Sequence, residues 1–461
     1  MQHWAKLFGL ASMMCASFTV AAAGAVTGKS AAKPAATNWA TSWAASVQGP
    51  YPIGNPSAQP NLSRAFPSAE TGANDQSFRL IIKPEHWGGK ARMRFSNALG
   101  TQPVTLDGAF AGLQWASSAL VPGSNRAVTF GGKKSVTVAA GESVWSDAVT
   151  LPFVKSGNEL RGRKLAMSFH VAGTSGPMTW HAKALQSSYV TAPGAGAKGH
   201  IEAEDAFPIA TASWYFLDAV DMSAPKGTGV IVAFGDSITD GTASTMNGDD
   251  RWPDVLARRL AVSSGKAAAN GKATTRWVVI NQGIGGNQVV GPKEYSPQKP
   301  FPGGPSALMR LDRDVLSLSG VKAVIWLEGT NDFSRNGNAE ADAVIDGMRD
   351  GVARMRAKLP GVKVIGATLT SALGANLPAH GFEAQDEKRK RLNDFIRNGG
   401  LFDGVADFDR ATTDPQTGGM KAEFVPDNTV GGPGDKLHPN RLGYQAMGMA
   451  IDLALFGVRG K

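Results

Sequence analysis

The stretch Val230-Ile-Val-Ala-Phe-Gly-Asp-Ser237-Ile-Thr-Asp-Gly241 begins as an apolar run and becomes polar within three residues. An apolar run of this length is typical of a parallel strand that is buried on both faces. Ser237 therefore follows the carboxyl end of a predicted strand, which is where open α/β sheets bind their ligands. The Gly-Asp-Ser sequence on its own is also compatible with an ordinary turn, so the rest of the chain must distinguish a reactive serine from a structural one.

The sequence after Gly229 alternates between strand patterns and helix patterns. Strands are expected at residues 230–234, 277–281, 323–327, 362–368 and 405–408. Helices are expected at residues 251–262, 306–318, 339–359, 385–398 and 442–456. Five strands that alternate with helices predict an α/β fold with a parallel sheet covered on both faces.

The first half of the chain has a different pattern. Between Ser77 and Met222 the hydrophobic period is about two residues, turns with glycine separate many short segments, and the last of these segments predicts a strand at residues 213–220. A further strand with two tryptophans is expected at residues 39–47. Many short strands without intervening helices favour a β-sandwich. Because 461 residues exceed one ordinary core, we predict a β-sandwich accessory domain at residues 38–225 and an α/β domain at residues 226–461.

The N-terminus has the composition of a secretory signal peptide. Residues 1–25 carry His3 and Lys6, then an apolar run, and end in small residues that suit cleavage. A membrane anchor and a lipoprotein at Cys15 are the alternatives. The run is short and alanine-rich for a span, and Met14 is too bulky for the usual residue before a lipidated cysteine. We expect a cleaved signal peptide, a linker at residues 26–37, no stable membrane anchor after cleavage, and a secreted or periplasmic protein.

The composition narrows the classes of partner and cofactor. Cys15 is the only cysteine, so the mature chain would have no disulfide. The formal net charge is +9, but the excess is scattered. No basic stripe alternates with aromatic residues, so nucleic acid is not an expected partner, although attraction to an acidic polymer stays open. The aspartates 249, 250, 312 and 314 lack the spacing of a cation site, so we expect them to be solvated loop and helix residues, and we expect no metal and no cofactor.

A histidine and an aspartate near the C-terminus are candidates for acid–base chemistry. His438 follows Asp435 by three residues in Gly434-Asp-Lys-Leu-His-Pro-Asn440. In a turn, the carboxylate can reach the imidazole, fix its tautomer and stabilise its protonated form. Pro439 disfavours helical geometry at His438 and so keeps it on a loop. Capping of the following helix is the structural alternative for this histidine.

Two further loops follow predicted strands and offer hydrogen-bond donors. Asn281-Gln-Gly-Ile-Gly-Gly286-Asn287 is rich in glycine, which lets backbone N–H groups approach a ligand closely. Gly329-Thr-Asn331-Asp332 presents an amide side chain that can donate without adding charge. Each loop taken alone is compatible with an ordinary turn.

In their order and content, these four segments resemble the SGNH hydrolase superfamily, the GDSL-type esterases and lipases. The resemblance implies a flavodoxin-like five-stranded parallel sheet. It implies a catalytic triad of Ser237, Asp435 and His438, with an oxyanion hole formed by Ser237, Gly286 and Asn331. Gly286 is chosen over Gly283 and Gly285 because it stands five residues after Asn281. The stretch at Trp39 and the β-rich half are also similar to secreted two-domain bacterial members.

The α/β-hydrolase fold is excluded as an alternative. Its nucleophile lies in Gly-x-Ser-x-Gly, with the acid and the histidine on separate segments. Here Thr239 occupies the place of the second glycine, and the acid and the base share one loop.

The expected activity is that of a serine esterase acting through an acyl-enzyme, with O-acetyl or other short acyl esters, including acylated polysaccharides, as candidate substrates. A lipase or lysophospholipase of the same family is one alternative. The other is a carbohydrate-binding protein in which Trp87, Trp115, Trp145 and Trp180 stack on sugars. The sequence leaves open the acyl preference, the oligomeric state and whether the loop at residues 290–304 covers the site.

Overall fold

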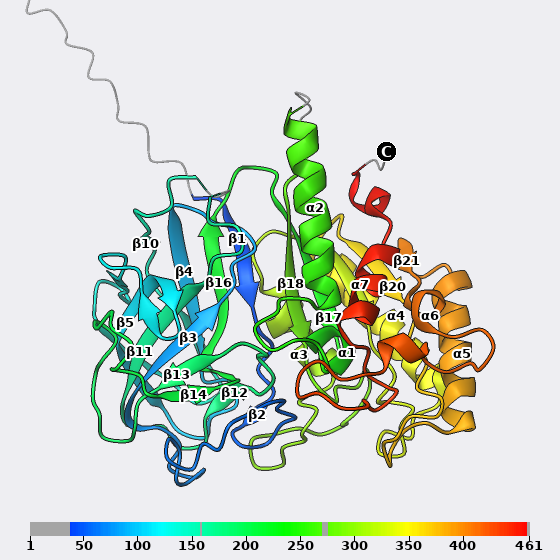
Figure 1. Ribbon diagram of the computed structural model, residues 1–461, viewed down its shortest axis with the longest axis horizontal. Coiled ribbons are helices and arrows are strands. Elements are labelled where there is room, and N and C mark those ends of the chain that lie inside the picture. The colour runs from blue at the N-terminus through cyan, green and yellow to red at the C-terminus, as the bar shows by residue number, and fades with distance from the viewer. Residues whose placement is uncertain (1–36, 157–158, 270–274, 459–461) are drawn as a thin grey trace, which may run out of the picture. The chain divides into compact units, whose positions relative to one another are not determined.

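The computed structural model describes residues 37–156, 159–269 and 275–458 (Figure 1). The predicted signal peptide and residues 26–36 of the predicted linker lie outside the described residues. Thr37–Lys461 form one compact unit, so the division after residue 225 stays a prediction. Within the described ranges, no helix combines the length and the apolar character that a membrane span requires.

The second half of the described chain contains a parallel sheet. Its strands are β17 (Gly229–Gly235), β18 (Trp277–Gly283), β19 (Val321–Leu327), β20 (Lys363–Ala367) and β21 (Gly404–Ala406). They lie in the order β18-β17-β19-β20-β21, and every neighbouring pair is parallel. β17, the first of these five strands in the sequence, therefore lies inside the sheet, between β18 and β19. This order places the loops that follow β17, β18 and β19 next to one another.

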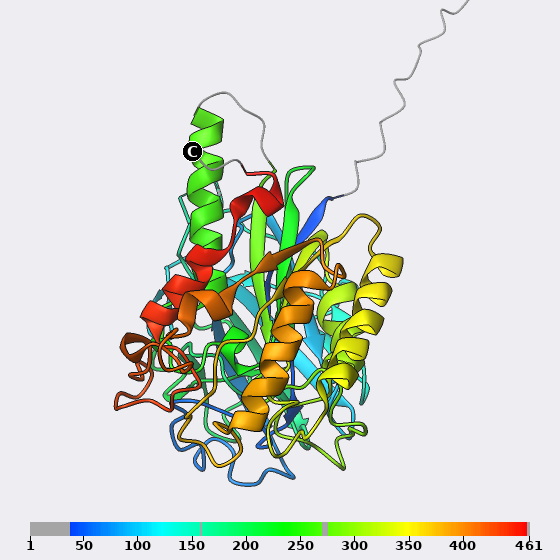
Figure 2. The ribbon, with the colours of Figure 1, turned by 90° about the vertical axis from the view of Figure 1, so that its right-hand side faces the viewer.

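Helices cover both faces of this sheet (Figure 2). On one face, α4 (Ala341–Lys358) and α5 (Glu383–Asn398) pack on a core that includes Val232, Trp326 and Met348. On the other face, α2 (Trp252–Ala269) and α7 (Arg441–Ala450) pack on a core that includes Ile231, Trp252 and Tyr444. Alternate residues of β17 thus contribute to the two cores, as the pleat of a strand requires. The shorter helices are α1 (Ser237–Asp240), α3 (Ala307–Leu311), a π-helix at Asp312–Leu316, α6 (Phe408–Thr412) and 3₁₀-helices at Ala422–Phe424 and Leu453–Phe456.

The first half is rich in antiparallel strands. One sheet has the order β1-β16-β4-β10, with β9 paired to β4, and a second has the order β14-β13-β3-β11-β5-β6, with β7 and β8 paired to β5. Their side chains meet in a common core, where the rings of Phe95 and Phe169 lie 5.4 Å apart. A short sheet, β15-β12-β2, adjoins them. The strands are β1 (Trp39–Ala44), β2 (Gly49–Pro50), β3 (Asn74–Ile82), β4 (Lys90–Ser96), β5 (Val104–Ala116), β6 (Ala119–Leu120), β7 (Arg126–Ala127), β8 (Ser135–Val138), β9 (Ser143–Trp145), β10 (Val149–Thr150), β11 (Leu165–Thr174), β12 (Thr179–His181), β13 (Ser188–Val190), β14 (Ile209–Thr211), β15 (Trp214–Tyr215) and β16 (Leu217–Ser223).

Strand β1 contributes to the cores of both halves. Ala40 and Ala44 belong to the apolar cluster of the parallel sheet, whereas Trp43 belongs to the cluster of the β-rich region. The backbone N–H of Thr41 also donates to Ser319 O at 3.0 Å. The β-rich region is therefore packed against the α/β region through a shared strand.

Two expected elements are divided in the structure. The strand expected at residues 213–220 is split into β15 and β16 at Phe216, whose φ of 58° lies in the left-handed region, outside regular strand geometry. The helix expected at residues 442–456 ends at Ala450. Asp452 then caps a separate 3₁₀-helix by accepting a hydrogen bond from the backbone N–H of Ala454.

Candidate active site

The turn after β17 places Ser237 at the first residue of a short helix. The Asp236 carboxylate accepts a hydrogen bond from the backbone N–H of Ile238 at 2.9 Å, and so caps α1. Gly241 ends the helix with a φ of 108° and donates its N–H to Ser237 O. Gly235 has no room for a side chain, because a Cβ there would lie 2.2 Å from Leu327 O. Local sequence therefore accounts for the sharp turn that presents the serine.

Ser237, His438 and Asp435 are joined by consecutive hydrogen bonds. Ser237 Oγ lies 2.8 Å from His438 Nε2, and His438 Nδ1 lies 2.6 Å from Asp435 Oδ2. The other carboxylate oxygen of Asp435 accepts the backbone N–H groups of Leu437 and His438, each at 2.9 Å. Lys436 adopts a φ of 61° within this tight turn. The structure thus brings together the serine, histidine and aspartate that the sequence singled out.

The electrostatics of this group favour an ionised aspartate. Burial by itself raises the pKa of Asp435, but the hydrogen bonds and charge of His438 and the N–H group of Leu437 hold it well below its ordinary value. Ser237 and His438 are 8% and 9% exposed, so the proton acceptor and the hydroxyl are largely shielded from water. An ionised carboxylate at Nδ1 leaves Nε2 as the acceptor toward the serine.

The two predicted donor loops meet beside the serine turn. Ile284 donates its backbone N–H to Gly235 O at 3.0 Å, and a Cβ on Gly283 would lie 2.2 Å from Asp240 N. Asn331 Nδ2 donates to Asn287 O at 3.0 Å, directly after Gly286 in the chain. Gly286 itself has a φ of 84°, a conformation that favours glycine. The five predicted site residues therefore come from neighbouring loops at one edge of the sheet, and their catalytic roles stay predictions.

A buried arginine holds these loops in place. Arg310 donates to Gly235 O and Gln282 O, both at 2.8 Å, and to Asn287 Oδ1 at 2.7 Å. It also pairs with Asp314 at 3.1 Å, and Asp314 is only 2% exposed. The expectation that Asp314 is a solvated helix residue is therefore wrong, because its charge is compensated inside the protein. Sequence reasoning missed Arg310, which carries no motif that distinguishes it from other arginines.

Buried carboxyl groups surround the strand ends. Burial, together with the charge of nearby Glu328, raises the pKa of Asp236 to about 8 and that of Asp332 to about 7. Asp332 accepts the backbone N–H groups of Val289 and Val290, at 2.8 and 3.0 Å, and so fixes the loop after Gly286. Within the described ranges, no group of three or more histidine, cysteine or acidic side chains is arranged to hold a metal ion.

The β-rich region also reaches the site, which the sequence did not indicate. Asn55 Nδ2 donates to Gly285 O at 2.7 Å, and Lys183 Nζ donates to Thr242 Oγ1 at 2.5 Å. His181 Nε2 lies 3.1 Å from Asp240 Oδ1. None of these residues stands in a recognisable motif, so only the three-dimensional arrangement identifies them.

The loop at residues 290–304 packs beside Gly286. Asn287 Nδ2 donates to Gly303 O at 2.6 Å, and Gln48 Nε2 donates to Pro302 O at 2.9 Å. A Cβ on Gly286 would lie 3.4 Å from Gly303 Cα. The end of this loop therefore fills the space between the glycine loop and the β-rich region.

The four tryptophans considered for sugar stacking differ in exposure. Trp87 and Trp180 are 3% and 1% exposed and belong to the core. The hypothesis that these two stack on sugars is wrong, since no ligand reaches them. Trp145 is half-buried under Arg92, whereas Trp115 is 69% exposed.

One family of known proteins matches the part of the chain that contains these segments. Residues 233–446 match the model of the GDSL-like Lipase/Acylhydrolase family. A search of curated proteins finds no match.

Several solved structures are similar to about half of the chain. Est24, a carbohydrate acetylesterase from Sinorhizobium meliloti, is 17% identical over 48% of this chain and 96% of its own, with a TM-score of 0.35. The aryl esterase of M. smegmatis is 18% identical over 50% of this chain and 100% of its own, with a TM-score of 0.37. A GDSL-like lipase from Bacteroides thetaiotaomicron is 18% identical over 50% of this chain and 90% of its own, with a TM-score of 0.32.

Proposed function

Through residues 233–446 the chain belongs to the GDSL-like lipase/acylhydrolase family, and we propose that it is a serine esterase that cleaves carboxylic esters through an acyl-enzyme. The observation that carries this proposal is the hydrogen-bond chain from Ser237 Oγ through His438 to Asp435, at 2.8 and 2.6 Å. This arrangement gives a weak nucleophile the base and the orienting carboxylate that it needs.

In the first step, Ser237 Oγ attacks the ester carbonyl and His438 Nε2 takes the hydroxyl proton. Asp435 stabilises the imidazolium that forms. The backbone N–H groups of Ser237 and Gly286 and the Asn331 amide hold the oxyanion of the tetrahedral intermediate. His438 then returns the proton to the leaving alcohol, and the acyl group stays on Ser237.

In the second step, His438 accepts a proton from water, and the resulting hydroxide attacks the acyl-enzyme. The second tetrahedral intermediate uses the same donors. Its collapse breaks the bond to Ser237 Oγ, which regains its proton from His438, and releases the acid. The cycle consumes one ester and one water and needs no cofactor.

The direct test is Ser237→Ala with p-nitrophenyl acetate as substrate. We expect the release of p-nitrophenol to fall to the rate of the solution without enzyme, with an unchanged circular dichroism spectrum. Ser244→Ala is a matched control, because Ser244 is a buried serine in the same segment and its hydroxyl has no hydrogen-bond partner in the described part of the chain. Retained activity in purified Ser237→Ala would refute the assignment.

We further propose short acyl esters, such as O-acetyl groups, as the preferred substrates. The support is the crowding beside the predicted oxyanion glycine. A Cβ on Gly286 would lie 2.7 Å from Asn55 Nδ2 and 3.4 Å from Gly303 Cα. Acetyl, butyryl, octanoyl and palmitoyl p-nitrophenyl esters test this directly. We expect kcat/KM to fall steeply beyond four carbons, whereas a lipase or lysophospholipase would keep or increase it.

An acylated polysaccharide is the natural form in which a secreted protein would meet such esters. The full chain carrying Ser237→Ala can be tested for retention on acetylated and deacetylated xylan and chitin. Retention only on the acetylated polymers supports a polysaccharide esterase. Equal retention on both, together with no hydrolysis by the unmodified protein, would favour the carbohydrate-binding alternative.

The proposed location is outside the cytoplasm, in the medium or the periplasm. Its support is the layout of residues 1–25, with two basic residues, an apolar run and a small-residue end. Determining the N-terminal residue of the protein recovered from the producing cells tests it. Cleavage near Ala25 is expected, and an intact Met1 in the cytoplasmic fraction would contradict it.

A further inference from the structure

A histidine of the β-rich region is surrounded by oxygen acceptors. His181 lies in β12 and is 2% exposed. Its Nδ1 lies 2.7 Å from Ser46 O, and its Nε2 lies 3.0 Å from Lys183 O and 3.1 Å from Asp240 Oδ1. Because carbonyl and carboxylate oxygens only accept hydrogen bonds, both ring nitrogens must carry hydrogens. His181 is therefore an imidazolium in this arrangement.

The protonation state has a consistent electrostatic cause. Burial by itself lowers the pKa of His181, but the Asp240 carboxylate and the hydrogen bonds to backbone oxygens outweigh burial and raise it above the ordinary value. His181 and Asp240 thus form a buried ion pair between the β-rich region and α1.

The second oxygen of Asp240 connects this pair to the glycine loop. Asp240 Oδ2 accepts the backbone N–H of Gly285 at 3.0 Å. Gly285 immediately precedes Gly286, whose N–H is the predicted oxyanion donor, and Asp240 lies in the same four-residue helix as Ser237. A continuous path of two polar contacts therefore runs from His181 to the residue before that donor.

We propose that His181 is a positioning residue for the reaction: it holds Asp240, and Asp240 holds the Gly285–Gly286 peptide where the oxyanion forms. This inference rests on the proposed esterase function. The β-rich region then completes the active site instead of serving as a separate binding module.

The glycine-rich loop at residues 281–287 needs such contacts to hold one conformation. A glycine-rich segment has many backbone conformations in the absence of tethers, and an oxyanion donor is effective only when it is fixed before the charge develops. If His181 loses its charge, Asp240 becomes a buried carboxylate with one partner fewer, and its geometry toward Gly285 relaxes.

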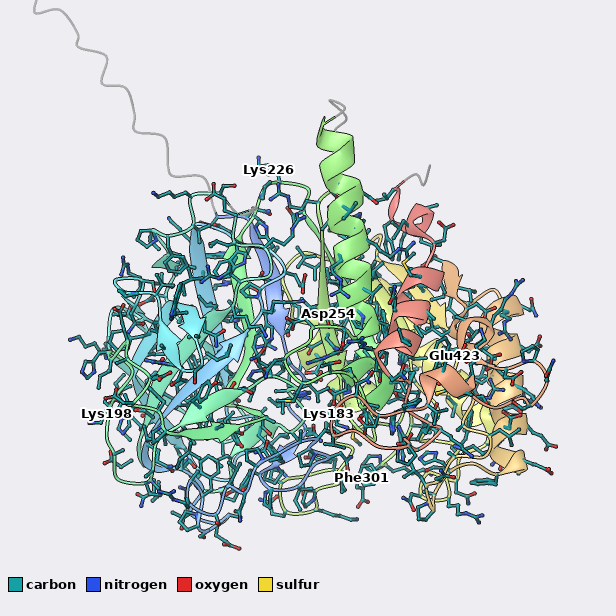
Figure 3. All side chains as sticks on the ribbon, viewed as in Figure 1. Lys183, Lys198, Lys226, Asp254, Phe301 and Glu423 are labelled. Carbon is teal, nitrogen blue, oxygen red and sulfur yellow. The ribbon has the colours of Figure 1, made fainter. Side chains whose placement is uncertain are left out.

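Other charged groups lie near the pair, among them the buried ammonium of Lys183, on which the charge of Asp240 also acts. A cavity of about 60 Å³ between β-rich and α/β residues is lined by His181 and Asp240 together with Lys83, Glu85, Asp249, Arg251 and Asp254. Lys83 pairs with Glu85 and with Asp254, both at 2.7 Å. Lys183, labelled with Asp254 in Figure 3, donates to Thr242. Asp240 is therefore the carboxylate that faces the imidazolium.

The test compares His181→Gln with His170→Gln in the full chain. His170 is a matched control, because it lies in the same β-rich region and its ring nitrogens also face two aspartates, Asp107 at 2.7 Å and Asp75 at 2.9 Å. Glutamine can still donate one hydrogen bond to Asp240 but carries no charge. We expect kcat, counted per active site from the p-nitrophenol burst, to fall 10- to 100-fold in His181→Gln with KM changed less than threefold. His170→Gln should match the unmodified protein.

Two further measurements separate positioning from a general loss of stability. Hydrogen exchange should increase in residues 283–287 of His181→Gln, and not in His170→Gln. If His181→Gln does not fold, Asp240→Asn, which keeps the shape of the side chain, takes its place with the same expected results. In the double variant, adding His181→Gln to Asp240→Asn should lower kcat no further, because both changes break one path.

The inference is overturned if exchange in residues 283–287 is unchanged, or if exchange increases while kcat stays the same. Failure of the proposed esterase function would instead appear as an inactive unmodified protein. The hydrogen-exchange comparison does not depend on activity, so the two failures are distinguishable.

Discussion

His438 Nδ1 lies 2.6 Å from Asp435 Oδ2, within a turn in which Asp435 Oδ1 also accepts the backbone N–H groups of Leu437 and His438. One carboxylate therefore both shapes the turn and orients the imidazole. Replacement by asparagine separates the two roles, because the amide oxygen can keep the backbone bonds while the amide nitrogen faces Nδ1.

We expect Asp435→Asn to lower kcat by about 10⁴-fold, with little change in the fold. An amide N–H at Nδ1 favours the tautomer with its proton on Nε2, which cannot accept the proton of Ser237. The hydrolysis of p-nitrophenyl acetate gives kcat. Asp427→Asn is the control, because Asp427 also accepts backbone N–H groups two and three residues ahead, at Thr429 and Val430, without an imidazole partner. An active Asp435→Asn would contradict the assigned role.

The buried capping residue Asp236 predicts a pH-dependent stability. Burial raises its pKa to about 8, against about 4 in the unfolded chain. Between these values the unfolded chain releases the proton and the folded chain keeps it. The contribution of Asp236 to stability is therefore fully present below pH ~4 and is lost as the pH rises to about 8.

Asparagine caps a helix as well as aspartate does and stays neutral. We expect the free energy of unfolding of Asp236→Asn, relative to the unmodified protein, to increase between pH 4.5 and pH 7.5 in urea titrations. Asp452→Asn, at the exposed cap of a 3₁₀-helix, is the control for the loss of a capping carboxylate. A difference for Asp236→Asn that decreases over this range would contradict the sign of the shift.

The sequence was informative where local rules act. The apolar run before Ser237 predicts a strand at residues 230–234, and β17 spans Gly229–Gly235. The Asp-x-x-His spacing predicts a contact between the carboxylate and the imidazole, because a turn of four residues brings the two side chains close together. Both inferences depend on neighbours in the chain and not on the packing of distant segments.

The sequence did not predict the contacts between segments that are far apart in the chain. Arg310 binds Gly235 O and two oxygens of the segment 281–287, and His181 binds Asp240 across 59 positions. A lone arginine or histidine has no periodicity that would reveal such partners. The division of the strand at Phe216 was likewise hidden, since a positive φ at a phenylalanine is imposed by the packing around it and not by local preference.

Asn331 tests the amide part of the predicted oxyanion hole. Its Nδ2 donates one hydrogen to Asn287 O at 3.0 Å, which leaves the second hydrogen for the substrate. We expect Asn331→Ala to lower kcat by about 10²- to 10³-fold with a smaller effect on KM, because the contact forms fully only with the oxyanion. Asn125→Ala is the control, since Asn125 Nδ2 also donates to a backbone oxygen at 3.0 Å, that of Gly199 in the β-rich region. Equal losses in both variants would indicate a structural role for Asn331.

Gly286→Ala tests whether the conformation of the glycine loop matters for the reaction itself. At a φ of 84°, alanine costs about 1–2 kcal/mol of backbone strain. Its Cβ would also lie 2.7 Å from Asn55 Nδ2, so either the loop or the Asn55 side chain that binds Gly285 O must shift. A displaced N–H at this position misses the oxyanion, and a misplacement of 1 Å can cost about 10²-fold in rate.

Gly400→Ala is the control that separates the backbone strain of a positive φ from the displacement of the N–H at position 286. Gly400 has a φ of 68°, but a Cβ there meets no atom within 4 Å. We expect both variants to lose a similar free energy of unfolding in urea titrations, while only Gly286→Ala loses about 10²-fold in kcat toward p-nitrophenyl acetate. If Gly286→Ala lost stability alone, the oxyanion donor would have to be sought elsewhere in the loop, with Gly285 excluded because its N–H is already bound to Asp240.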